Sequence, residues 1–259
     1  MSRTRTRQWS GRQQAAVAAA AAVAAFGVLV GAALLWDTTH PPSVVRHGPA
    51  TATSPPPTTI PAASAAELLR SSAAALRATT TAHVAGAIGG GASPVRVDLS
   101  VTANGDAQGT LVIAGVPVDV VRTGGRTYVR SRQLIESIAG ATVASYVGDR
   151  WVALDPGRLG SGTERALDQA TSLDGIASLI ETSAGMAQAG VPTTLAGRRV
   201  TEVVSGITVI DVAADGPPYP LRVAAGEGTT LDLGRFGQSV VVVAPSRGVV
   251  DLDRLPGIG

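Results

Sequence analysis

The sequence predicts an α+β fold class, with an antiparallel sheet and segregated helices held outside a membrane behind an N-terminal anchor. Three observations predict it: a long uncharged stretch near the N-terminus, a proline-rich stretch after it, and short segments that alternate apolar and polar residues. The chain has 259 residues, of which 45% are apolar and 15% charged. This composition is sufficient to bury a core, so the chain as a whole is not disordered.

The anchor is the stretch 15–36, whose 22 residues carry no charge and would span about 33 Å as a helix. Residues 1–14 carry four arginines, and Asp37 follows the stretch directly. The positive-inside rule therefore predicts a basic cytoplasmic tail at 1–14, a transmembrane helix or signal anchor at 15–36, and a single-pass cell-membrane protein with an extracytoplasmic C-terminal domain. The alternative is a signal peptide cleaved near Gly31, which predicts a secreted protein.

A stalk is predicted for residues 37–62. Seven of the 21 residues from Pro41 to Pro61 are proline, with threonine, serine and alanine between them. Such a composition cannot build a core, and as an extended spacer it would reach up to about 60 Å. We therefore expect a disordered stalk that holds the following domain away from the membrane.

Residues 63–259 are expected to form the extracytoplasmic domain. Ser64 and Glu67 have the spacing of a capping box and predict a helix from Ser64 to about Ala78, and a second helical period runs from about Leu173 to Ala189. Alternation and turn glycines predict strands at 95–101, 110–114, 116–123, 126–131, 151–154, 193–195, 199–204, 208–213, 221–225, 229–233 and 239–243.

Composition excludes several classes of chemistry. The chain has no cysteine, and all 21 of its basic residues are arginine. Thiolate nucleophiles, cysteine-bound metals, Schiff bases and the P-loop lysine are therefore excluded. From residue 13 onward 17 arginines face 19 carboxylates. The high pI thus belongs to the short tail, and nucleic-acid binding is not expected.

Candidate catalytic and metal residues are sparse. His83 is the one histidine beyond the stalk, no nucleophile elbow accompanies it, and we expect it at a helix end or in a loop. Asp251 and Asp253 lack a calcium-loop pattern and are expected to be solvated. Four other acids, each a polar partner in an alternating strand, are expected to form ordinary sheet surface: Asp98, Asp119, Asp211 and Asp232. We expect no enzyme, no cofactor and no metal site.

The order of the strand segments resembles the LppX/LprAFG-type exported lipoproteins over about residues 65–254. The resemblance is carried by 95–101 (VRVDLSV), 109–113 (GTLVI), 118–129 (VDVVRTGGRTYV), 151–155 (WVALD), 218–222 (PYPLR) and 236–245 (FGQSVVVVAP). It implies a LolA-like half-barrel, in which a strongly bent antiparallel sheet carries helices on its concave side and encloses a cavity that in some members holds acylated lipids or lipoglycans. Such members are carriers without catalysis. This chain departs from the family in having no cysteine for a lipid anchor.

Alternation along the predicted strands indicates which residues would line a ligand site. Small aliphatic side chains leave a hollow between layers or fill it, and both interpretations apply to each candidate. The candidates are Val97, Leu99, Leu111, Ile113 and Val120. The resulting expectation is a non-catalytic, membrane-tethered binding protein for lipid or acylated envelope molecules. The alternative is a structural or interaction ectodomain with a filled core and an envelope protein as partner.

Overall fold

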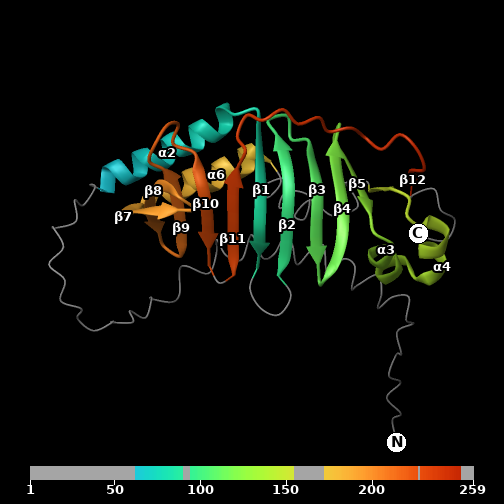
Figure 1. Ribbon diagram of the computed structural model, residues 1–259. Coiled ribbons are helices and arrows are strands. Elements are labelled where there is room, and N and C mark those ends of the chain that lie inside the picture. The colour runs from blue at the N-terminus through green and yellow to red at the C-terminus, as the bar shows by residue number, and fades with distance from the viewer. Residues whose placement is uncertain (1–61, 90–93, 155–171, 227, 252–259) are drawn as a thin grey trace, which may run out of the picture.

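The structure, a computed structural model, describes residues 62–89, 94–154, 172–226 and 228–251. One bent, unclosed sheet of twelve strands dominates these ranges (Figure 1). The strands are β1 (Thr81–Ile88), β2 (Val95–Thr102), β3 (Ala107–Ile113), β4 (Val116–Thr123), β5 (Arg126–Arg130), β6 (Val152–Leu154), β7 (Gln188–Leu195), β8 (Arg198–Ser205), β9 (Thr208–Ala213), β10 (Pro220–Ala225), β11 (Thr229–Gly234) and β12 (Val250–Asp251). The helices are α2 (Ala62–Ala78), α3 (Arg132–Ala139), α4 (Ala141–Val147), α6 (Leu173–Ser183) and the 3₁₀ turn η3 (Ala184–Met186).

The sheet consists of two antiparallel meanders that share one ladder. Its strand order is β12-β6-β5-β4-β3-β2-β1-β11-β10-β9-β8-β7. Strands β1 to β6 pair as sequence neighbours, as do β7 to β11, and β1 pairs with β11 to join the two sets. The one parallel pair is β12 with β6 at an edge. The predicted antiparallel α+β class is therefore confirmed.

Alternation of side chains explains the strands and divides the sheet into two faces. In β2 every second side chain from Val95 to Val101 is buried, while Arg96 and Asp98 between them are exposed. The buried side faces a single continuous core, to which the helices also contribute Leu69, Leu76, Ile176 and Ile180. We call this side the aliphatic face and the opposite side the outer face.

The helices cover the two ends of the sheet. α2 packs along α6 and against β7, β9 and β10, whereas α3 packs on α4 and β4. The guanidinium of Arg77 in α2 donates to Asp174 and Glu181 in α6 at 2.9 and 2.8 Å, and these hydrogen bonds raise the pKa of Arg77. Because the pairs are exposed, their contribution to stability is small.

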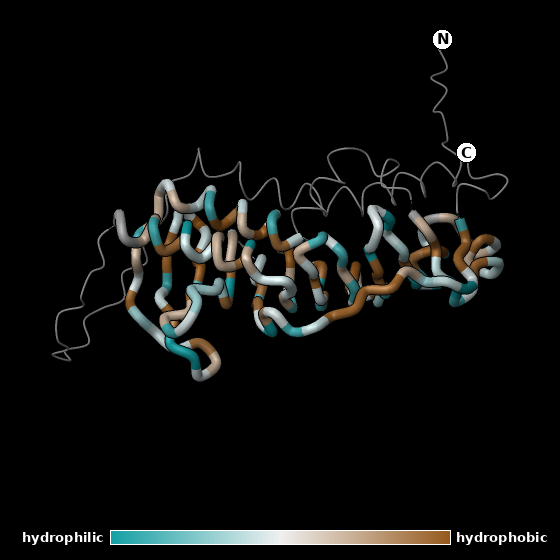
Figure 2. The backbone as a smooth tube through the Cα atoms, turned by 90° about the horizontal axis from the view of Figure 1, so that it is seen from above, coloured by the Kyte–Doolittle hydropathy of each residue, from teal (hydrophilic) through white to brown (hydrophobic). Residues whose placement is uncertain are grey.

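A long segment between β11 and β12 runs along the ends of β1 to β5 without pairing to any described strand (Figure 1). At one end the Gly237 amide donates to the Thr81 carbonyl at 2.9 Å, and at the other the Val250 amide donates to the Trp151 carbonyl at 2.8 Å. Its hydrophobic stretch lies along one side of the sheet (Figure 2), and Val241 and Val243 are exposed. The prediction of a paired strand at 239–243 is therefore wrong, because the valines are extended but no neighbouring strand is in register.

Three further sequence predictions need correction. The stretch Thr81–Ile88 is a central strand, and two short helices follow β5 where none was expected. The second predicted helix ends at Ser183, and the strand β7 begins at Gln188. The predicted tail, the anchor and nearly all of the stalk lie outside the described residues. Among the residues that the structure describes, no helix has the length and hydrophobicity to cross a membrane.

Candidate functional site

The five predicted lining residues lie on one face of three adjacent strands. Val97 of β2 is opposite Leu111 of β3, and Leu99 and Val120 flank Gly109 in β3 from either side. Val97, Leu99 and Leu111 are at most 7% exposed, while Ile113 and Val120 are half-buried and pack against the same core. Register thus brings all five candidates together on the aliphatic face.

Two glycines interrupt the side chains of this face. Gly86 in β1 is opposite Val97, and Gly109 in β3 is opposite Leu99. Their φ angles of 151° and 152° lie in a region that side chains rarely adopt. Neither position is open space, because an added Cβ would lie 2.0 Å from the Thr230 carbonyl oxygen at Gly86 and 2.0 Å from the Asp98 carbonyl oxygen at Gly109. The sequence showed glycines at these points, but it could not show that both lie next to candidate lining residues.

A buried hydroxyl lies on the core-facing side of α2. Ser72 is fully buried among residues such as Leu69 and Leu76, and its hydroxyl has no hydrogen-bond partner within the described part of the chain. Burial without a partner costs free energy, because the hydroxyl loses its hydrogen bonds to water.

Replacing Ser72 with alanine is expected to raise the free energy of unfolding by about 1 kcal/mol, because it removes the unpaired hydroxyl and improves helix propensity. Chemical denaturation of both chains measures this difference. Ser71→Ala, next to it in the same helix at a partly exposed position, is the control and is expected to change stability less. A loss of stability in Ser72→Ala would show that the hydroxyl has a partner.

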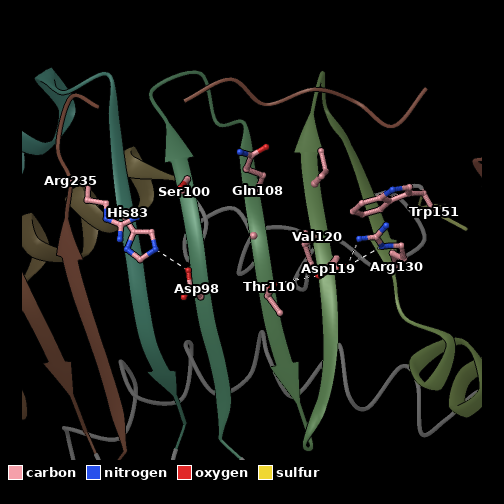
Figure 3. A pocket seen from close by; sticks show the side chains of 12 residues that line it. His83, Asp98, Ser100, Gln108, Thr110, Asp119, Val120, Arg130, Trp151 and Arg235 are labelled. Atoms are coloured by element: carbon pink, nitrogen blue, oxygen red, sulfur yellow. Dashed lines mark hydrogen bonds and ion pairs between the residues drawn. The ribbon is translucent and has the colours of Figure 1, made fainter. Parts of the chain in front are cut away.

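The outer face carries polar side chains in two rows that run across the strands (Figure 3). The first row, defined by the pairing of β1 to β3, comprises His83, Ser100 and Gln108. The charged row, two residues away along the strands and defined by the pairing of β2 to β5, comprises Asp98, Thr110, Asp119 and Arg130. Asp98 and Asp119 lie on the surface of the sheet, as predicted. That they belong to one aligned row was not predicted from the sequence.

Hydrogen bonds connect these rows. His83 Nε2 and Asp98 Oδ1 are 2.8 Å apart, and Arg130 donates through Nε and Nη2 to Asp119 Oδ2 at 3.0 and 2.8 Å. The Arg130 guanidinium lies 4.8 Å from the centroid of the Trp151 ring, a cation–π contact. Together with Arg235 these residues outline an open hollow of about 440 Å³ on the outer face.

The expectation that His83 lies at a helix end or in a loop is wrong. His83 lies on β1 with its side chain on the outer face against Asp98. The described residues contain no group of three histidine or acidic side chains placed to hold a metal ion. The error has a local cause, because the small residues around His83 give β1 no clear alternation.

Asp211 continues the pattern of charged side chains at the other end of the sheet. It lies on β9 opposite Arg222 of β10, which in turn pairs with Asp232 of β11 at 2.7 Å. Asp211 itself is buried. Desolvation raises its pKa above the ordinary value of 3.8, although the nearby charge of Arg222 acts in the opposite direction.

Asp211→Asn is therefore expected to be more stable than the wild type at pH 7. Because the pKa of Asp211 is raised in the folded state, the carboxyl group does not lower the free energy of unfolding below pH 3.8, where it is protonated in both states. Its ionisation lowers the free energy of unfolding fully once the pH exceeds the folded-state pKa. Denaturation midpoints measured across this range should show the advantage of the variant growing as pH rises. Asp232→Asn, which removes an exposed and ion-paired carboxylate, serves as the comparison and should show no such gain. A pH-independent difference for Asp211→Asn would contradict the assignment.

Comparison with known proteins finds similarity in structure alone: no family model matches the sequence, and no curated protein matches it. LppX from Mycobacterium tuberculosis is 18% identical, covering 70% of this chain and 98% of that chain with a TM-score of 0.47. LprF from Mycobacterium bovis is 14% identical, covering 70% and 97% with a TM-score of 0.44. The MucA/MucB complex of Pseudomonas aeruginosa is more distant, at 17% identity, 71% and 59% coverage and a TM-score of 0.30. LppX and LprF are of the exported lipoprotein type that the strand segments of this chain resemble.

Proposed function

We propose that this chain is a membrane-tethered, extracytoplasmic binding protein for lipid or acylated envelope molecules, without catalytic activity. The observation that supports it is the aliphatic face of an unclosed sheet, on which the registers of β2 to β4 bring all five branched aliphatic candidates together. Such a face offers an acyl chain contact with branched aliphatic side chains. Among the described residues of β1 to β4, the charged side chain on this face is Arg122, opposite Ala107 at one end of β3.

The energetics suit an acyl ligand. Removing one methylene from water contributes about 0.8 kcal/mol, so ten methylenes contribute about 8 kcal/mol before the costs of association. The candidate lining residues Val97, Leu99 and Leu111 lie in one core with the helices. Our proposal places the concave, helix-bearing side of the half-barrel here, with the acyl chain between α2, α6 and the sheet.

The proposed tether determines where such a ligand is exchanged. With an uncleaved helix at 15–36 and a stalk at 37–62, the domain stays within about 60 Å of the membrane. We therefore propose that it presents or hands over lipid close to the membrane and does not carry it across a wide space.

Photo-cross-linking of the full-length chain tests the proposal. Cells expressing it are fed a fatty acid that carries a diazirine and an alkyne, irradiated, and the purified chain is digested after arginine. All five candidates fall in one peptide, 97–122, and the predicted anchor falls in another, 13–46. We expect label on 97–122 that excess unlabelled lipid removes. Label confined to 13–46 would show membrane contact only and would overturn the proposal.

One observation favours the second candidate function. Val97, Leu99 and Leu111 are already buried without a ligand, as they would be in the filled core of an interaction ectodomain. Both candidate functions share the fold and the tether. Lipid binding requires room for a ligand beside these residues, whereas a filled core has no such room. The Val97 experiment in the Discussion separates them.

A further inference from the structure

We propose that the outer face carries a second binding site, an open groove that takes a neutral oligosaccharide chain. The hollow of about 440 Å³ lies across β1 to β5, between His83 and Arg235 at one end and Trp151 at the other (Figure 3). Its volume lies within the usual range for ligand sites. Its rows of polar side chains lie on the opposite side of the sheet from Val97 and Leu99, and of the five lipid candidates Val120 alone also lines it. The inference therefore does not depend on the proposed lipid site.

The two rows give the groove a ladder of hydrogen-bonding groups. Neighbouring strands are about 4.8 Å apart and the rows are two residues apart along each strand, about 7 Å. A ligand running across the strands therefore meets polar side chains along both edges. A sugar chain has this form, because each ring carries hydroxyl groups around its rim and C–H groups on its faces. Ser100, Gln108 and Thr110 supply both donors and acceptors to such hydroxyls.

The charges of the groove cancel. Asp98 is paired with His83, and Asp119 accepts both hydrogen bonds from Arg130. A basic ligand would have to compete with His83 or Arg130 for these carboxylates, and an acidic ligand would meet Arg235, which among the described residues is the one cation of the groove outside the two pairs. A neutral ligand with many hydroxyls can use the outward lone pairs and N–H groups while the pairs stay intact.

Trp151 supplies the apolar surface that a sugar ring requires. Its indole is partly exposed at the end of the groove, and Arg130 holds the ring at 4.8 Å from the guanidinium. Fixing the ring beforehand reduces the entropy lost on binding. A ring held in this way is suited to stacking on the C–H face of a sugar.

Arg235 provides an independent indication of a functional site. Three non-glycine residues of the described chain have positive φ, and Ala114 and Ala196 each precede a glycine in a hairpin turn. Arg235 has a φ of 50° outside any hairpin, and it has no ion-pair partner among the described residues. Such strain costs about 1 kcal/mol or more and is concentrated at functional sites. We assign Arg235 the role of a hydrogen-bond donor to the sugar at this end of the groove.

Binding is tested with the full-length chain in phosphatidylcholine nanodiscs, since alkyl-glucoside detergents would compete. Trp9→Phe and Trp36→Phe leave Trp151 as the only tryptophan, so its fluorescence reports on the groove. Cellohexaose, maltohexaose and chitohexaose are the neutral probes, and hexagalacturonate is the acidic one. We expect at least one neutral probe to shift the Trp151 emission with a Kd below about 1 mM. No saturation by any probe, or tighter and salt-sensitive binding of hexagalacturonate, would overturn the proposal.

Arg235→Gly separates binding from structure. Glycine relieves the positive φ, so the variant should be more stable than the wild type, while calorimetry should show binding of the neutral probe weakened about tenfold. Ala196→Gly relieves the same strain in a hairpin away from the groove and should leave binding unchanged. Unchanged binding in Arg235→Gly would refute the role of Arg235. Fatty-acid labelling of peptide 97–122 should be the same in all three chains.

Discussion

Gly109→Ala is expected to destabilise the domain by about 3 kcal/mol or more. An added Cβ would lie 2.0 Å from the Asp98 carbonyl oxygen on β2, and the φ of 152° is itself unfavourable for alanine. The clash is with backbone in the middle of a ladder, so relief requires β2 and β3 to separate. Thermal or chemical denaturation followed by circular dichroism measures the loss.

Two other glycines separate the clash from the backbone strain. Gly105→Ala has a positive φ of 79° but no atom within 4 Å of the new Cβ, and it should cost about 1 kcal/mol. Gly185→Ala has neither a positive φ nor a close neighbour and should be almost neutral. If Gly109→Ala cost no more than Gly105→Ala, the close approach of β2 and β3 would be wrong.

Val97→Phe is expected to abolish fatty-acid cross-linking to peptide 97–122 without lowering the stability of the domain. Val97 lies on the aliphatic face, and the added ring would project into the layer that we assign to an acyl chain. The measurements are the yield of labelled peptide and the free energy of unfolding. Filling a hollow adds buried apolar surface, whereas overpacking a filled core typically costs 1–3 kcal/mol.

Val200→Phe calibrates this result. Val200 is fully buried in a small separate cluster with Ala213 and Leu221, so the same substitution there should lower stability and leave cross-linking intact. If Val97→Phe lost as much stability as Val200→Phe, the layer against Val97 would already be filled by side chains of the protein. The interaction-ectodomain function would then be favoured over lipid binding.

The strands that sequence predicted well are those whose signal is local. β4 and β9 match the predicted ranges 116–123 and 208–213, because glycines mark the turns beside them. β1 was missed because alanines and Gly86 dominate it. Its strand state depends on pairing with β2 on one side and β11 on the other, which no local pattern contains.

The sequence contains a pattern from which the first of the two short helices after β5 could have been predicted. Ser131 caps α3 by accepting from the Leu134 amide at 3.4 Å, and a serine before an amphipathic stretch is a helix-start pattern. The error at 239–243 is of the opposite kind, because four valines have strand propensity but lack a partner strand. Propensity alone cannot supply the second half of a ladder.

The candidate sites could be predicted to different degrees. Alternation in β2 to β4 indicates the aliphatic face, and register places all five candidates on it. That they line a ligand site stays a prediction. The groove could not be predicted, because Asp98, Asp119 and Arg130 become neighbours only through the registers of four strands. Arg235 and Trp151 reach it from separate, distant parts of the chain.

The single ladder between β1 and β11 determines the order in which the domain can assemble after export. Each meander pairs segments that are close in sequence, so each can form early, whereas the seam between them joins residues about 150 positions apart. We expect this late seam to limit the folding rate, and until it closes, the first-emerging half exposes the unpaired edge of β1 to other chains in the envelope.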